Sequence, residues 1–323
     1  MPAKNIYTNV ANITALLEYH GEITPKTTIF SSIPGENVIF DVEGILKYPI
    51  NINSLTAQPL NELARHVLGI IGSYECVTTK MITDCLNLLG IPADSKHILS
   101  ACEQLRKTGL IHAFRFKCED DCKPAGYIVY TISKLAGENA LHSLGVAINQ
   151  VDNYNVVMDP ANIKKKLATN QILFAHLKLN NEVAGFEKSK RYTAVNKTTD
   201  EHVAIKPSLF ISFNDESSLF YEVVRKSPFW KTELENKLYR YKILQDNWES
   251  SKEIPQLVIC CENAEHAKEV YKMVQTIRLK ALFTHDLLFF GENFNHHLFR
   301  INNMKEILYF RISFDEKEAK EAV

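Results

Sequence analysis

The residues around Glu222 have some of the types and spacing that metal-dependent cleavage of a phosphodiester requires. Nucleases of the restriction-endonuclease type place a carboxylate at the start of one strand and Glu-x-Lys on the next, so that two metal ligands and a cation surround one phosphate. Here Ser208 stands at the first carboxylate position and Val224 at the lysine position. Because serine is a poor magnesium ligand and valine carries no charge, no catalytic residue is expected. The alternative is a displaced site of Glu187, Glu222 and Lys226 that uses Mg²⁺.

Basic side chains elsewhere have the chemistry needed to contact DNA phosphates and base edges. The candidate DNA contacts are Lys96, His97, Arg106 and Lys107 on an expected recognition helix, Arg115 and Lys117 on the strand after it, and Arg225, Lys237 and Arg240 in the C-terminal half. Nine basic and nine acidic residues cancel between Leu55 and Gly145, and Glu119, Asp120 and Asp121 would meet phosphate at the tip of the following hairpin. A domain that binds only protein is therefore the alternative.

No metal site is expected from the cysteines and histidines. Cys118 and Cys122 form one doublet, but no second doublet follows at the spacing that zinc sites use. Cys260 and Cys261 are adjacent and point to opposite faces of one expected strand. The chain also lacks a Walker loop and the GxGxxG, GxSxG and HExxH patterns, so we expect no cofactor.

Length and composition limit the kind of protein. The 323 residues are enough for about two domains, and 46% hydrophobic residues with a net charge of −1 argue against wholesale disorder. No apolar run is long enough to span a bilayer, and the N-terminus lacks the features of a signal peptide. We expect a cytoplasmic protein with no membrane partner and no disulfide framework.

The elements that would position these residues fall into three segments. Residues 1–54 are expected to form a small strand-rich segment, with a helix-like stretch from Val10 to Tyr19. Residues 55–148 contain three helical patterns and then a hairpin, which is the order of a winged helix-turn-helix domain. In this domain we expect Thr78 or Thr79 to cap the second helix and Ser95 the third.

The third segment, residues 149–323, alternates helices and strands. Strong strands are expected at Leu209–Phe213 and Leu219–Val224, a long helix at Trp230–Asn247, and an apolar strand at Gln256–Cys261. This order predicts a mixed sheet with helices packed on it. The fold class is therefore α+β or α/β.

This order resembles the replication-relaxation proteins of bacterial plasmids and integrative elements. The resemblance covers about residues 60–290, and its pieces include Leu105–Leu110, Lys206–Phe213, Tyr221–Arg225, Lys237–Tyr241 and Gln256–Cys260. It implies a winged helix followed by a restriction-endonuclease-like domain, and a role in plasmid replication or DNA relaxation. The usual acid after the proline is Ser208 here, and the acid two places beyond Glu222 is Val224. The resemblance therefore implies a degenerate nuclease-like domain.

We expect a non-enzymatic DNA-binding or regulatory factor of a bacterial mobile element, active in plasmid replication, relaxation or transfer. Its partners would be double-stranded DNA and proteins of a replication or transfer complex. A homodimer is plausible because winged-helix proteins often bind two half-sites. A divergent metal-dependent nuclease and a winged-helix scaffold for protein interaction are the alternatives.

Overall fold

The chain divides into two units in a computed structural model. Unit 1 consists of Met1–Ser31 and Ala175–Val323, and unit 2 consists of Ser32–Phe174. The structure describes residues 6–11, 28–40, 60–118, 127–133, 136–145, 159–179, 183–188, 190–248, 253–290, 298–301 and 307–311.

Three capped helices form the first part of unit 2. They are α3 (Glu62–Tyr74), α4 (Thr79–Leu88) and α5 (Ser95–Lys107). Thr78 caps α4, as the sequence predicts, because its hydroxyl accepts a hydrogen bond from the Met81 amide at 3.3 Å. For α5, the expected cap Ser95 is wrong. Asp94 is the cap, and its carboxylate accepts from the His97 amide at 2.8 Å.

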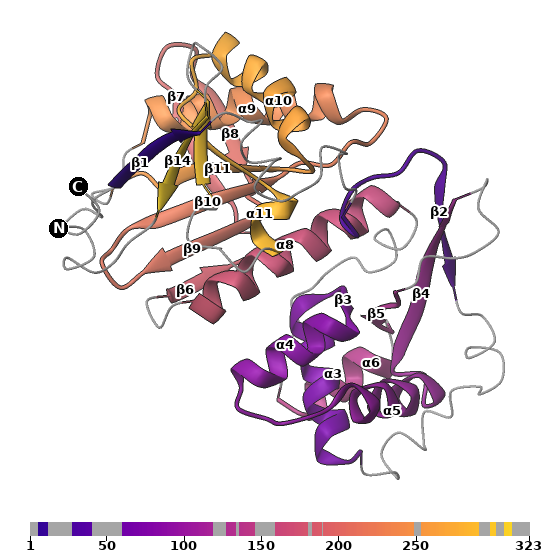
Figure 1. Cartoon of the computed structure of the whole chain (residues 1–323). Helices are drawn as coiled ribbons and strands as arrows, with labels where there is room; N and C mark the ends of the chain where they lie inside the picture. The colour runs from indigo at the N-terminus through magenta and orange to yellow at the C-terminus, as the bar shows by residue number, and fades with distance from the viewer. Residues whose placement is uncertain are drawn as a thin grey trace. The chain divides into compact units, whose positions relative to one another are not determined.

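A four-stranded antiparallel sheet completes unit 2. Its strands, in spatial order, are β2 (Glu36–Phe40), β4 (Ile111–Cys118), β5 (Val129–Ile132) and β3 (Val77–Thr78). The expected hairpin is β4 with β5, which pairs Ile111 with Ile132. A helix, α6 (Ala136–Ser143), follows β5. The sheet gains its outer strand β2 from the N-terminal segment, so both edges of β4 are paired (Figure 1).

Unit 1 is built on an eight-stranded mixed sheet. Its strands, in spatial order, are β1 (Ile6–Ala11), β14 (Ile307–Arg311), β13 (Leu298–Ile301), β12 (Leu282–His285), β11 (Gln256–Cys261), β10 (Ser218–Val223), β9 (Leu209–Phe213) and β6 (Val183–Glu187). The strands β9 and β10 form an antiparallel hairpin, whereas β10, β11 and β12 run parallel. Val10 and Ala11 therefore lie in a strand where a helix was expected, and the rest of that expected helix lies outside the described residues.

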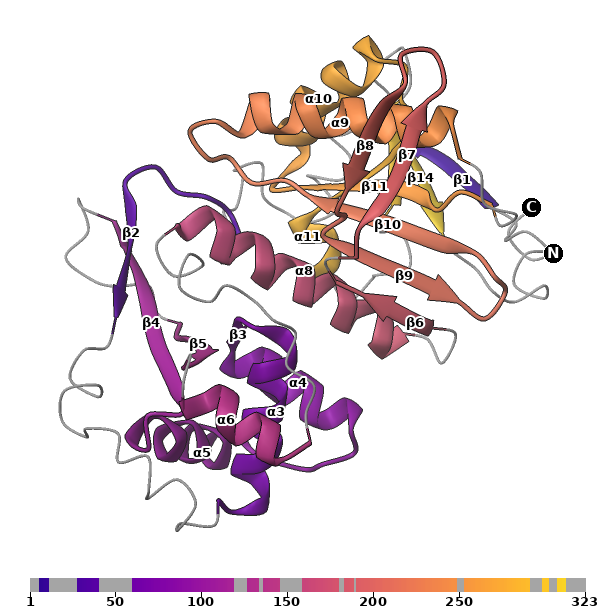
Figure 2. The same ribbon diagram turned by 180° about the vertical axis from the view of Figure 1, so that it is seen from behind.

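Helices pack on this sheet because its buried strands are apolar. They include α9 (Trp230–Asp246) and α10 (Ala264–Thr276), which cover one face of the sheet (Figure 2). Two further described helices are α11 (Asp286–Phe290), directly after β12, and α8 (Pro160–Leu179), whose last residues belong to unit 1. A separate hairpin, β7 (Tyr192–Asn196) with β8 (Glu201–Ile205), lies against α9. The fold is thus a mixed α+β arrangement.

The described helices also bear on membrane insertion. None of them combines the length and the apolar character needed to cross a bilayer.

Candidate nucleic-acid interface

The helix α5 is amphipathic and firmly placed in unit 2. Its inner side buries Ile98, Ala101, Cys102 and Leu105. Lys96, Leu99 and Lys107 are on its exposed side. Because the Asp94 cap and this apolar stripe fix both the start and the rotation of the helix, the exposed side is a defined surface.

Carboxylates hold most of the cations that were expected on α5. The imidazole of His97 lies 2.8 Å from Asp94, and the hydrogen bond from the His97 amide lowers the pKa of Asp94. Glu103 forms ion pairs with two more of these cations, Arg106 at 2.9 Å and Lys107 at 3.7 Å. Lys96 is different, since no described residue forms an ion pair with it.

The strand β4 carries two further expected contacts on one face. Arg115 and Lys117 lie opposite Ile39 and Asn37 of β2, and directly opposite residues of an antiparallel pair share a face. Neither neighbour is acidic, and within the described part of the chain neither cation has an ion pair. Among the described residues, these two cations therefore have no acidic neighbour directly opposite them on this face of the sheet. The acidic tip at residues 119–121 lies outside the described residues.

The one carboxylate on β2 lies on the opposite face. Glu36 forms an ion pair with Lys164 of α8, and both side chains are buried. The Lys164 ammonium also lies 5.0 Å from the centre of the Phe116 ring. Lys166 is paired with Glu75 at 2.6 Å. Two lysines of the run at 164–166 are thus structural cations of unit 2.

The expected DNA contacts in unit 1 do not form one surface. Arg225 is only 4% exposed and its guanidinium lies 2.7 Å from Asp286. Lys237 extends from α9 to Glu222, with 2.5 Å between the ammonium and the carboxylate. Arg240 on the same helix is exposed. Of the three, Arg240 alone is available to a phosphate in this structure.

Glu222 sits in a small polar cluster at the end of the β9–β10 hairpin. Besides Lys237, its carboxylate accepts a hydrogen bond from the Tyr241 hydroxyl at 3.2 Å, and the Ser208 hydroxyl lies 3.5 Å away. The Ser208 hydroxyl also accepts from the Val223 amide at 3.1 Å. Burial, and after it Glu222, raises the pKa of Tyr241. Ser208 and Glu222 are therefore neighbours, as the hairpin pattern requires, but a lysine from a helix neutralises the carboxylate.

The displaced nuclease site would consist of Glu187, Glu222 and Lys226. Glu187 is paired with Lys190 at 2.7 Å, and Lys226 is paired with Glu269 at 2.8 Å, so each has a partner other than Glu222. Among the described residues, no group of three or more histidine, cysteine or acidic side chains gathers to hold a metal ion.

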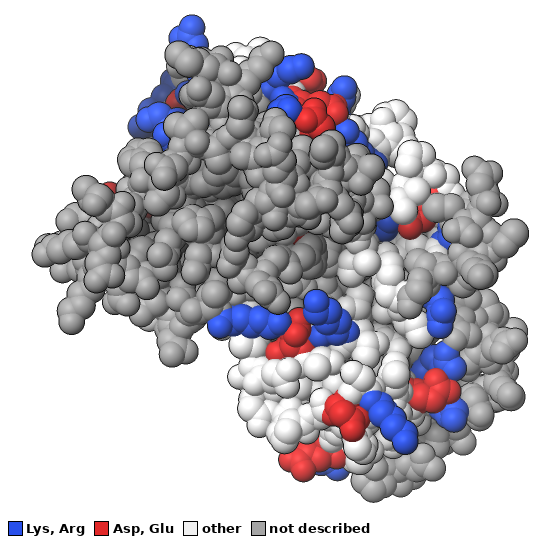
Figure 3. Space-filling model, viewed as in Figure 1, with Lys and Arg blue, Asp and Glu red and all other residues white. Residues whose placement is uncertain are grey.

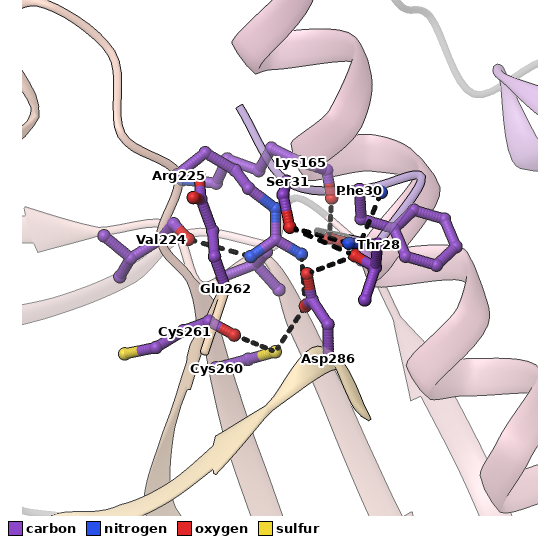
Figure 4. Close-up of polar contacts among 12 residues, drawn as sticks. Thr28, Phe30, Ser31, Lys165, Val224, Arg225, Cys260, Cys261, Glu262 and Asp286 are labelled. Carbon is purple, nitrogen blue, oxygen red and sulfur yellow. Dashed lines mark hydrogen bonds and ion pairs between the residues drawn. The ribbon is translucent and has the colours of Figure 1, made fainter. Parts of the chain in front are cut away.

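A second buried cluster lies where the parallel strands β10, β11 and β12 end (Figure 4). Asp286, directly after β12, accepts hydrogen bonds from Arg225 at 2.7 Å and from the Thr28 hydroxyl at 3.0 Å. Burial raises the pKa of Asp286 to about 6, although Arg225 and Thr28 act in the opposite direction. Burial works against the charged form of Arg225, yet Asp286, Cys260 and Glu262 raise its pKa. The Arg225–Asp286 ion pair thus binds the Thr28 hydroxyl at the edge of the sheet.

Sequence reasoning missed this cluster because its members are far apart in the chain. Thr28 and Asp286 are separated by 258 residues. The available signal was positional: the carboxyl ends of parallel strands meet at one edge of a sheet, and polar residues there lie close together. Since the sequence does not show which strands are parallel neighbours, this signal was not usable.

Acidic and basic side chains are interspersed on the described part of the face in Figure 3. On the face of the molecule in Figure 3, lysines and arginines lie beside acidic residues in most places. Any interface with a polyanion therefore depends on the few cations that lack a carboxylate partner within the described residues, such as Lys96, Arg115 and Lys117.

Comparison with known proteins adds no relative. No family model, curated protein or solved structure matches the chain. The resemblance to the replication-relaxation proteins therefore stays a prediction.

Proposed function

We propose that unit 2 is a winged-helix module that binds double-stranded DNA through α5 and β4. The observation that carries this proposal is the position of Lys96, Arg115 and Lys117, which are cations without an ion pair among the described residues. A helix, a strand, two helices and a hairpin follow one another in the order of such modules. Phosphate contacts by these three side chains would place α5 against a groove.

The proposed role is that of a non-enzymatic DNA-binding or regulatory factor of a bacterial mobile element. In this proposal unit 1 is a degenerate nuclease-like domain. Two features support the assignment: Ser208 and Glu222 are neighbours on the β9–β10 hairpin, and Lys237 neutralises Glu222. A carboxylate that is buried and paired in this way is a poor ligand for Mg²⁺.

Fluorescence anisotropy with a mixed-sequence duplex tests the proposal. The variant Lys96→Gln/Arg115→Gln/Lys117→Gln should bind about tenfold or more weakly at low salt. Its slope of log affinity against log salt should be shallower by up to about 3, because each phosphate contact accounts for about 0.9 of the slope. The matched control is Lys272→Gln/Arg278→Gln/Lys280→Gln, which changes three exposed cations elsewhere that have no ion pair among the described residues.

The two variants separate the possible outcomes. Equal weakening by both would mean that net charge alone drives binding, and an unchanged affinity of the first variant would overturn the proposed interface. A gel of the products with Mg²⁺ tests the enzyme alternative. Cleavage that Glu222→Gln abolishes would establish a nuclease.

A protein partner is the second candidate, and one observation favours it. Three leucine side chains are exposed in this region. Leu88, the last residue of α4, is 39% exposed, and Leu89, which follows it, is 59% exposed. Leu99 on α5 is 45% exposed. Exposed leucines next to a recognition helix are typical of protein contact rather than phosphate contact. Absence of DNA binding at low salt, together with loss of a co-purifying protein in Leu89→Ser/Leu99→Ser, would favour this function.

A further inference from the structure

The β7–β8 hairpin is an addition to the sheet of unit 1. The flanking strands β6 and β9 pair directly, with Glu187 opposite Phe210. Residues 190–206 leave the sheet between these strands and form a two-stranded sheet of their own, with Tyr192 opposite Ile205. The strand order of the eight-stranded sheet does not depend on this hairpin.

The inner face of the hairpin is anchored. Val203 and Ile205 are buried, and Tyr192 and Ala194 pack against the core beneath α9. The Tyr192 ring makes an edge contact with Phe220, with ring centres 4.6 Å apart. At the other end, the Asn247 side chain accepts a hydrogen bond from the Lys197 amide at 3.3 Å. The β7–β8 hairpin (Figure 2) is therefore held in place at both its base and its tip.

The outer face of the hairpin has no acidic residue. Alternation along the paired strands places Thr193, Val195, His202 and Ala204 on this face. Val195 is 36% exposed. The acidic residues of the hairpin, Asp200 and Glu201, lie at its tip, and Glu201 alternates onto the other face. Between the base and the tip of the hairpin, a polyanion would meet none of the hairpin's own carboxylates on this face.

Two cations flank the base of this outer face. Arg191 and Lys206 directly precede and follow the Tyr192–Ile205 pair, and both are exposed. Within the described part of the chain neither has an ion pair, whereas Lys190 beside them is held by Glu187 and lies over the Tyr192 ring. Like charges on neighbouring strands repel. Phosphates are the counter-charge that would relieve this repulsion.

We propose that the outer face of the β7–β8 hairpin lies in a groove of double-stranded DNA, with Arg191 and Lys206 on the phosphate backbone. A major groove about 12 Å wide admits a two-stranded β-ribbon. Thr193, Val195 and His202 then face the base edges. This second contact surface rests on the proposed DNA binding, but it uses residues of unit 1 alone.

The test is duplex binding by full-length Arg191→Gln/Lys206→Gln. Because this variant cannot make two of the phosphate contacts, the salt slope should fall by about 2 and the affinity at low salt by about five- to tenfold. Lys272→Gln/Lys280→Gln is the matched control and should bind like the parent protein. Thermal unfolding of both variants should match the parent, because the replaced side chains are exposed.

Photo-crosslinking provides a second readout. With p-benzoylphenylalanine at Val195, the protein should crosslink to the duplex. The same residue at Tyr239, which is exposed on α9, should not.

The outcomes distinguish the two proposals. The hairpin contact alone would be overturned by three results together. Arg191→Gln/Lys206→Gln would bind like the parent protein, no crosslink would form at Val195, and the Lys96, Arg115 and Lys117 variant would bind more weakly. No duplex binding by the parent protein would overturn both. A crosslink to a protein in place of DNA would also overturn the ribbon proposal.

Discussion

At the scale of single residues, the partner of a carboxylate decides its chemistry. Sequence spacing predicted that Glu222 and Ser208 would be neighbours, because a hairpin brings the ends of its strands together. The spacing did not predict Lys237 as the partner of Glu222, because the packing of α9 on the sheet determines that contact. The residue that resembles a metal ligand in the sequence is a structural charge in the fold.

Removal of Lys237 should therefore destabilise unit 1. In Lys237→Met the buried Glu222 carboxylate loses its ion pair with Lys237, and the free energy of unfolding should fall by about 1–3 kcal/mol. This range is below that of fully buried pairs because Lys237 is partly exposed. Urea unfolding measures the change.

Two further variants test the cause. Glu222→Gln combined with Lys237→Met should recover much of the loss, because residue 222 then carries no buried charge. Lys242→Met removes an exposed ion pair with Asp246 on the same helix and should change stability by about 0.5 kcal/mol or less. Equal losses in Lys237→Met and Lys242→Met would show that the Glu222 pair is not a buried charge pair.

At the scale of elements, local patterns predicted most helices and the central strands. Apolar residues at helical spacing located α3, α4 and α5, and turn residues located the β9–β10 hairpin. The strands β1 and β2 join different sheets, opposite β14 and β4. These pairings join residues distant in the chain, and local periodicity carries no information about them.

Close packing around α6 gives a test at the same scale. A Cβ atom at Gly137 would lie 2.3 Å from the Leu110 carbonyl oxygen, which is backbone, whereas one at Gly72 of α3 would meet the flexible end of Leu141. Gly137→Ala should lower the free energy of unfolding by about 1–3 kcal/mol. Gly72→Ala should lower it less, because the leucine side chain can move.

Thermal unfolding of both alanine variants measures the difference. Alanine favours a helix over glycine by about 1 kcal/mol. A higher midpoint for Gly137→Ala than for the parent protein would therefore mean that the gain in helix propensity is larger than the cost of the steric clash. It would show that α6 is not packed tightly against residue 110.

At the scale of the whole molecule, the proposals place one DNA surface in each unit. The first is formed by Lys96, Arg115 and Lys117, and the second by Arg191 and Lys206. When two surfaces of one chain hold the same duplex, the second contact is intramolecular and its effective concentration is of the order of millimolar. If both proposed surfaces bind the same duplex, the combined affinity would exceed that of either surface alone.

Dependence on duplex length tests this joint binding. On a long duplex, the Arg191→Gln/Lys206→Gln variant should bind more weakly than the parent protein. As the duplex is shortened, this difference in affinity should vanish once the duplex is too short to contact unit 1 as well as unit 2. The weakening caused by Lys96→Gln/Arg115→Gln/Lys117→Gln should persist at every length. Anisotropy titrations with a series of duplexes at fixed salt measure both effects, and a ribbon effect of constant size at all lengths would show that the two surfaces do not share one DNA molecule.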